Sequence, residues 1–226
     1  MPAVPLKQEY GPTLGALLAP RWRRASRAAR VGWLAGTALL AAALAAAVLT
    51  LVPPTVSHGG PVPFSFSYTG LYRTHAPPGW YAQVRRVAGG RLEDSFAVGP
   101  LTLPPYHGAL GAALAVYAAG YVQRLAAGAA VPVVPGQAGF ALRGEGATQI
   151  DAVSTYPTYN VFYTTTVDGR EMYGRVALVL PPGAGVRRGV QIAMLTAVAG
   201  NRQVTSSLDV GVKGTLEEPL STFALG

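Results

Sequence analysis

An uninterrupted apolar run at residues 31–52, VGWLAGTALLAAALAAAVLTLV, constrains this chain more than any other feature. The run holds no charged residue, and as an α-helix its 22 residues would extend about 33 Å, the hydrocarbon thickness of a bilayer. We therefore predict one transmembrane helix at 31–52. It would separate a basic tail at 1–30 from a linker rich in proline and glycine at 53–63 and a folded domain at 64–226.

The basic residues beside this run predict its orientation. Five arginines precede it closely, namely Arg21, Arg23, Arg24, Arg27 and Arg30, whereas the first basic residue after it is Arg73. Positively charged flanks stay in the cytoplasm, so the tail is expected inside the plasma membrane and the domain outside it, with Trp33 at the inner interface. The competing interpretation is a signal peptide cleaved near the alanines at 45–47. Signal peptides, however, have apolar cores of about 7–15 residues and short basic leads.

Two glycines in the run suggest how a second helix would pack there. Gly32 and Gly36 form a GxxxG pattern, which lets two membrane helices approach closely and favours a homodimer face. Chance spacing is the alternative, because small residues are common throughout the run.

The formal net charge of +8 is unevenly distributed. Residues 1–30 carry +5 and the remaining residues carry +3. The excess therefore indicates membrane topology and attraction to anionic lipid of the inner leaflet. It does not indicate nucleic acid as a partner. The chain contains no cysteine, which excludes disulfides, thiolate metal sites and lipidation of cysteine.

Beyond the linker, the pattern of apolar residues predicts an α+β domain. Phe64, Phe66 and Tyr68 alternate with serines, which is typical of a half-buried strand. A helix is expected over 108–127, where apolar residues recur at intervals of three and four: Leu110, Leu114, Tyr117, Tyr121 and Leu125. Further strands are expected at 71–75, 80–87, 95–103 and 190–199, and a short C-terminal helix at 216–225.

The clearest local prediction is a β-hairpin with strands at 158–167 and 170–180 around Asp168-Gly169. Asp-Gly between β-branched and aromatic runs favours a two-residue turn, because both turn positions need positive φ. This turn pairs residue 167 with residue 170. It places Tyr163 opposite Gly174 on a face that is expected to be buried.

The other face of the hairpin is expected to be largely exposed to solvent. It carries Phe162, Tyr173 and Arg175, and Phe162 lies opposite Arg175, which predicts an aromatic–guanidinium contact. Large exposed patches of this kind mark interaction sites. We therefore predict that these three residues form a surface for a partner, namely another protein of the cell envelope.

Several segments, taken in order, resemble the PsbP-like fold. They are APPGW at 76–80, one central helix, GREMYGRVALVL at 169–180 and the closing PLSTFALG at 219–226. That fold is known from photosystem extrinsic proteins and a nuclear-import factor, and many bacterial envelope proteins are similar. The resemblance covers about residues 62–226. It implies an antiparallel sheet with a binding or assembly role, and it brings over no functional residue. A cystatin-like or NTF2-like cone is the alternative fold, although its helix normally comes earlier.

The sequence offers little that could carry catalysis. His58, His75 and His107 stand apart, and none has a second ligand at metal-pair spacing. Motifs for a nucleophile elbow, a zinc protease, a P-loop or a dinucleotide site are absent, and RGEG at 143–146 lacks a following helix. Neighbouring carboxylates, each explained by a turn or a nearby arginine, are Glu93 and Asp94, Glu145 and Asp151, and Asp168 and Glu171. We predict no catalytic residue, no metal and no cofactor.

Three functions follow, in order of preference. The first is a non-enzymatic, membrane-anchored domain that binds a partner or helps an assembly outside the plasma membrane. The second is a carrier or sensor of a small ligand, with a pocket between sheet and helix lined by Tyr117 and Tyr121. The third is an envelope hydrolase, which would need two carboxylates from different elements to converge as acid and base.

Overall fold

The computed structural model describes residues 26, 31, 34–41, 53–128, 134–147, 155–199 and 202–226. It contains two compact units, Met1–Val52 and Pro53–Gly226. In the first unit, residues 31 and 34–41 are helical and exposed, and the rest of the predicted span lies outside the described residues. No helix among the described residues has the length and apolar character needed to cross a membrane.

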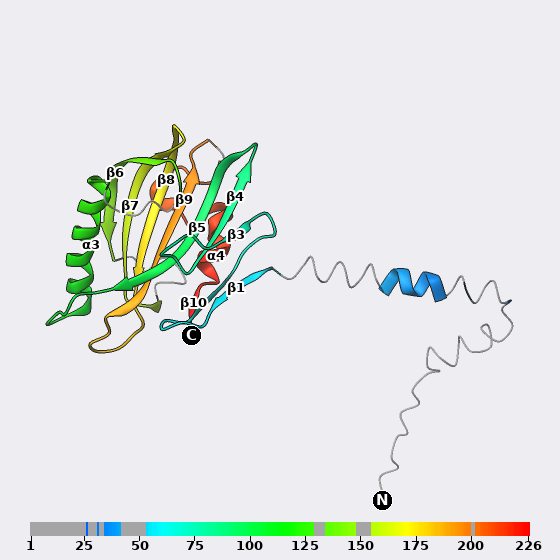
Figure 1. The fold of residues 1–226 in the computed structure, drawn as a ribbon, viewed down its shortest axis with the longest axis horizontal. Helices are drawn as coiled ribbons and strands as arrows, with labels where there is room; N and C mark the ends of the chain where they lie inside the picture. The colour runs from blue at the N-terminus through cyan, green and yellow to red at the C-terminus, as the bar shows by residue number, and fades with distance from the viewer. Residues whose placement is uncertain are drawn as a thin grey trace, which may run out of the picture. The chain divides into compact units, whose positions relative to one another are not determined.

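The second unit is α+β, as predicted, and is built mainly from antiparallel strands (Figure 1). The described residues form one sheet of seven strands, in the spatial order β3 (Arg73–His75), β4 (Ala82–Ala88), β5 (Arg91–Thr102), β9 (Arg188–Ala197), β8 (Arg170–Val179), β7 (Thr158–Val167) and β6 (Gln137–Gly146). They also form a smaller sheet in the order β1 (Thr55–His58), β2 (Phe64–Ser67) and β10 (Ala224–Leu225).

Each face of the larger sheet supplies one hydrophobic core, because successive side chains of a strand point to opposite faces. Val176 and Leu178 of β8 belong to the core beneath α3 (Leu110–Ala126), whereas Ala177 and Val179 belong to the core on the other face. The helix packs against β6 and β7 at one side of the sheet (Figure 1). Both cores lie wholly within Pro53–Gly226, so this unit buries its own apolar surface.

The second core is covered by the smaller sheet and by the C-terminal segment. That segment contains the 3-10 turns η2 (Ser207–Asp209) and η3 (Gly214–Leu216) and the helix α4 (Glu217–Ser221). The terminal helix is shorter than predicted, because the chain turns after it and pairs β10 with β2.

The predicted linker at 53–63 is partly folded. Residues 55–58 form β1, which pairs with β2, and the ring of His58 stacks on Tyr81 at 4.3 Å and on Phe64 at 5.2 Å between centroids. The folded unit therefore begins at residue 53. Its first strand was not predicted, because the segment is rich in proline and glycine.

The central hairpin has the predicted register. Val167 pairs with Arg170, and Tyr163 pairs with Gly174. Asp168 and Gly169 have φ values of 50° and 76°, as a two-residue turn of this type requires.

Candidate functional site

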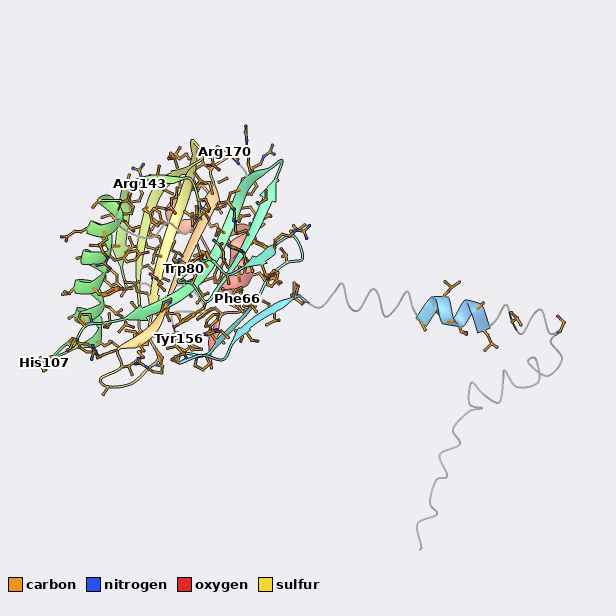
Figure 2. The ribbon with its side chains drawn as sticks, viewed as in Figure 1. Phe66, Trp80, His107, Arg143, Tyr156 and Arg170 are labelled. Atoms are coloured by element: carbon orange, nitrogen blue, oxygen red, sulfur yellow. The ribbon has the colours of Figure 1, made fainter. Side chains whose placement is uncertain are left out.

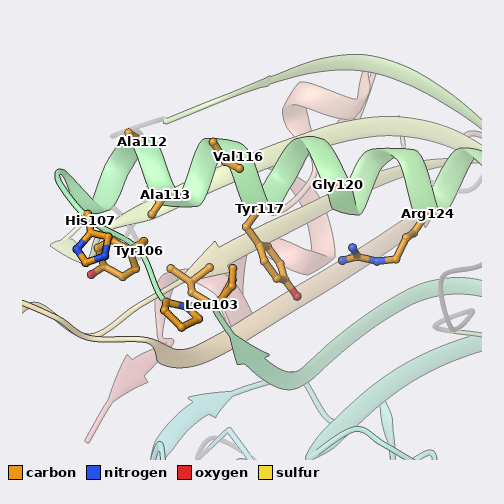
Figure 3. A pocket seen from close by; sticks show the side chains of 11 residues that line it. Leu103, Tyr106, His107, Ala112, Ala113, Val116, Tyr117, Gly120 and Arg124 are labelled. Carbon is orange, nitrogen blue, oxygen red and sulfur yellow. The ribbon is translucent and has the colours of Figure 1, made fainter.

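A groove runs between α3 and the segment 103–107 that leads into it from β5 (Figure 3). Its cavity volume is about 380 Å³. The helix lines it with six residues, namely Ala112, Ala113, Val116, Tyr117, Gly120 and Arg124. We call this site the α3 groove.

The spacing of the helical residues explains how they form one wall. Positions 113, 117, 120 and 124 recur at intervals of three and four, so they share a face of the helix. That face lies beside the buried stripe that includes Leu114 and Ala118. Ala113 and Gly120 have little or no side chain, which leaves the room that the groove occupies.

The opposite wall is the segment 103–107, LPPYH, which is fastened to the chain before β9. The Leu103 N–H donates to the Arg187 carbonyl over 2.8 Å, and Arg187 Nε donates to the Leu103 carbonyl over 3.1 Å. Tyr106 Oη donates to the Val186 carbonyl over 3.1 Å. The two prolines between these anchors restrict φ. This wall is therefore held in place by the protein itself.

Arg124 supplies the charge of the helical wall. Its guanidinium carbon lies 5.6 Å from the ring centroid of Tyr117 and 5.6 Å from that of Tyr121, so the arginine stacks on both rings. The side chain is exposed, and among the described residues it makes no ion pair or hydrogen bond. Tyr117 and Arg124 extend from the same side of the helix (Figure 3). One end of the groove thus carries a positive charge with unused donors.

The structure separates the two tyrosines that were predicted to line one pocket between sheet and helix. Tyr117 lines the α3 groove, whereas Tyr121 is buried in the core beneath the helix. Burial raises the pKa of Tyr121 to about 12, the neighbouring Tyr117 adds to this, and Arg124 opposes it. Tyr121 is therefore neutral at physiological pH and acts as part of the surface on which Arg124 rests.

The predicted partner surface of Phe162, Tyr173 and Arg175 is largely buried. Arg175 is 1% exposed and Phe162 is 5% exposed, because the chain around η2 packs on this face of the hairpin. Arg175 Nε donates to Asn160 Oδ1 over 2.9 Å, and a terminal nitrogen donates to the Val210 carbonyl over 3.1 Å. Tyr173 is half-buried and packs against the hydrophobic core on the face of the large sheet opposite α3. The expectation that this face is wet is wrong, and its arginine holds the C-terminal segment instead.

One detail of that prediction is confirmed. The Arg175 guanidinium lies 5.4 Å from the ring centroid of Phe162, as their predicted cross-strand pairing requires.

The histidines do not assemble into a site. His58 belongs to the aromatic stack of β1, His75 ends β3, and His107 lies at the outer edge of the unit beyond the start of α3 (Figure 2). Within the part of the chain that the structure describes, no group of three or more histidine and carboxylate side chains is placed to hold a metal ion.

The pair Glu93 and Asp94 lies inside β5 and not in a turn as predicted. Asp94 is fully buried and forms an ion pair with Arg86 at 2.5 Å, while Glu93 pairs with Arg170 at 3.0 Å. Each carboxylate is thus neutralised by an arginine from a neighbouring part of the large sheet.

The residues predicted to flank or dimerise the membrane helix mostly lie outside the described residues. These are Arg21, Arg23, Arg24, Arg27, Arg30, Gly32 and Trp33. Gly36 is described and helical, and a Cβ added to it would meet no described atom within 4 Å outside its own helix backbone. Their roles stay predictions.

Comparison with known proteins does not place the chain in a family. No family model matches it, and no curated protein matches it. Among solved structures, the chain is similar to LpqN, a protein involved in cell envelope biogenesis of Mycobacterium tuberculosis. The TM-score is 0.48 and the sequence identity 11%, over 76% of this chain and 90% of LpqN. A similarity of this degree does not transfer a role, and the resemblance to PsbP-like proteins stays a prediction.

Proposed function

We propose that the chain is a single-pass membrane protein whose folded unit binds a small, mainly apolar molecule in the α3 groove. The observation that carries this proposal is the groove itself. Its volume of about 380 Å³ falls in the range of about 300–1,000 Å³ that is typical of pockets for organic ligands. One wall is part of a regular helix and the other is fixed by hydrogen bonds to the chain before β9, so a ligand would find the site preformed.

The chemistry of the walls favours binding over turnover. The groove is lined mainly by alanine, valine, leucine, proline and tyrosine. Its other side chains include His107 and Arg124, and none of its described lining residues is a carboxylate, serine or cysteine. Such a site can retain an apolar body by burying it. It lacks the paired acid and base that the hydrolase hypothesis needs.

Blocking the groove tests this function. Gly120→Leu places a side chain between Tyr117 and Arg124, since even a Cβ there would lie 3.6 Å from an Arg124 terminal nitrogen. We expect binding of the uncharged apolar dye Nile red, followed by fluorescence, to weaken at least about tenfold, which corresponds to about 1.4 kcal/mol. The change also removes a helical glycine, so α3 should become more stable and unfolding would not explain the loss.

Gly111→Leu is the matched control. It is the same substitution in the same helix, at a glycine with open space that does not line the groove. Equal loss of dye binding in both variants, or unchanged binding in Gly120→Leu, would contradict the proposed function.

We also propose that residues 31–52 anchor this unit outside the plasma membrane. The support is the uncharged run and the arginines before it. Because the chain has no cysteine, one introduced cysteine reports its own location. Leu208→Cys, at an exposed position, should react with a membrane-impermeant maleimide in intact cells, whereas Ser26→Cys should react only after lysis. The reverse pattern, or no protection of either, would refute this topology.

A further inference from the structure

We propose that the α3 groove is specific for a single-chain amphiphile with a carboxylate head, and that Arg124 binds this head while the apolar chain lies along α3. This inference rests on the proposed function and adds the ligand class to it. Three observations carry it: the shape of the groove, the state of Arg124, and the absence of competing charge in the described lining.

The shape of the groove favours an elongated ligand. Its helical wall extends from Ala112 to Arg124, and the twelve helical steps between these residues rise about 18 Å. Between these ends the wall offers only Ala113, Val116, Tyr117 and Gly120. A long wall of this kind, with so little volume, fits an extended chain better than a compact ring system.

Arg124 is prepared to bind an anion. Contact with the rings of Tyr117 and Tyr121 holds the guanidinium beside the helix but uses none of its N–H groups in a described hydrogen bond. A guanidinium is charged at all physiological pH values and matches a carboxylate with two parallel hydrogen bonds. A single arginine balances the single charge of a carboxylate, which is why we favour this head over a doubly charged phosphate.

A simpler role for Arg124 is to offset the negative end of the α3 dipole, since it lies in the last turn. The position of the Arg124 guanidinium favours anion binding in the groove over this simpler role. A terminal nitrogen reaches back to within 3.6 Å of where a Gly120 Cβ would be, one turn toward the helix start and into the groove. No described residue that lines the groove is acidic, so nothing there neutralises the arginine.

Paired probes test this inference on Pro53–Gly226, whose two cores are self-contained. Decanoate and decanol share one chain and differ in the charge of the head, and calorimetry gives their affinities. The unaltered unit should bind decanoate about 10- to 100-fold more tightly than decanol, the usual effect of a hydrogen-bonded charge. Arg124→Gln should abolish this preference and leave decanol binding and the thermal midpoint nearly unchanged.

Arg202→Gln is the control, because it removes the same charge from an exposed residue that does not line the groove. It should keep the preference for decanoate. Equal affinity for the two probes in the unaltered unit, or a preference that survives Arg124→Gln, would overturn the role of Arg124 and leave the proposed function standing. Binding of neither probe, or binding that Gly120→Leu does not weaken, would overturn the proposed function as well.

Discussion

Asp94→Ala should lower the free energy of unfolding of Pro53–Gly226 by about 3–5 kcal/mol, because it leaves Arg86 without its counter-charge and two hydroxyl donors inside the fold without their acceptor. Asp94 is 0% exposed and pairs with Arg86. Its carboxylate also accepts hydrogen bonds from the hydroxyls of Thr196 over 2.6 Å and Thr215 over 2.7 Å. Thr215 belongs to η3, so this one side chain joins β4, β5, β9 and the C-terminal segment. Denaturant unfolding followed by circular dichroism measures the effect.

Glu93→Ala is the control for this prediction. Glu93 is the adjacent residue, but its side chain is 11% exposed and it pairs with Arg170 without the two hydroxyl donors that Asp94 has, so this pair should contribute only about 1 kcal/mol. If Asp94→Ala costs no more than Glu93→Ala, the assignment of a structural role to the buried network is wrong. Replacing both partners, as Arg86→Met with Asp94→Leu, should recover part of the loss, because no unpaired charge then remains.

Gly174→Ala should destabilise the same unit by about 1–3 kcal/mol, the range for overpacking a filled core. A Cβ at this position would lie 2.4 Å from the Tyr163 ring, which covers Gly174 from the opposite strand. Tyr163 cannot move aside easily, since it is fully buried beneath α3. Thermal and denaturant unfolding both report the change.

Gly144→Ala in β6 is the matched strand glycine. The nearest neighbour of an added Cβ there is Phe162 at 4.0 Å, so the substitution should be neutral or slightly stabilising. The double variant Gly174→Ala with Tyr163→Leu should be less destabilised than the sum of the two single changes. The smaller leucine leaves room for the alanine methyl group, and this methyl group fills part of the space that the tyrosine ring leaves. Additive effects would show that the tyrosine does not cover the glycine.

Sequence patterns predict those elements of the fold that are determined by residues close together in the chain. The Asp168-Gly169 turn fixes the pairing of two whole strands, including the contact between Tyr163 and Gly174. The helical period from Leu110 to Leu125 likewise predicts α3 to within two residues. Both follow from neighbours in the chain, for which local propensity is sufficient.

What the sequence does not predict depends on distant segments. β6 has five glycines and alanines beside few apolar residues, and it is a strand because it completes the edge of the sheet next to β7. The second face of the hairpin is buried because the chain around η2 lies over it, and nothing near Phe162 or Arg175 in sequence signals that cover. The same limit explains why the buried role of Asp94 is missed.

The α3 groove shares one residue, Tyr117, with the pocket that the sequence analysis places between sheet and helix. Arg124 also lines the groove, but it lies outside the apolar stripe of the helix. The spacing of apolar residues therefore does not identify it as a site residue. Its position three residues after Tyr121 and seven after Tyr117 is the signal that would have found it, because residues at these spacings lie on the same side of a helix, where a long arginine side chain can reach both rings. The facing wall at 103–107 needed the fold, since its hydrogen bonds go to residues about eighty positions later.

Amide NMR of the isotope-labelled unit during a titration with decanoate tests the central claim most directly. If the α3 groove is a binding site, shift changes should concentrate on Ala113, Tyr117, Gly120 and Arg124 and on the facing segment 103–107, and they should saturate. The smaller sheet, on the other face of the unit, should stay unchanged. No saturable change, or changes centred on β1 and β2, would contradict the assignment of this groove as the functional site.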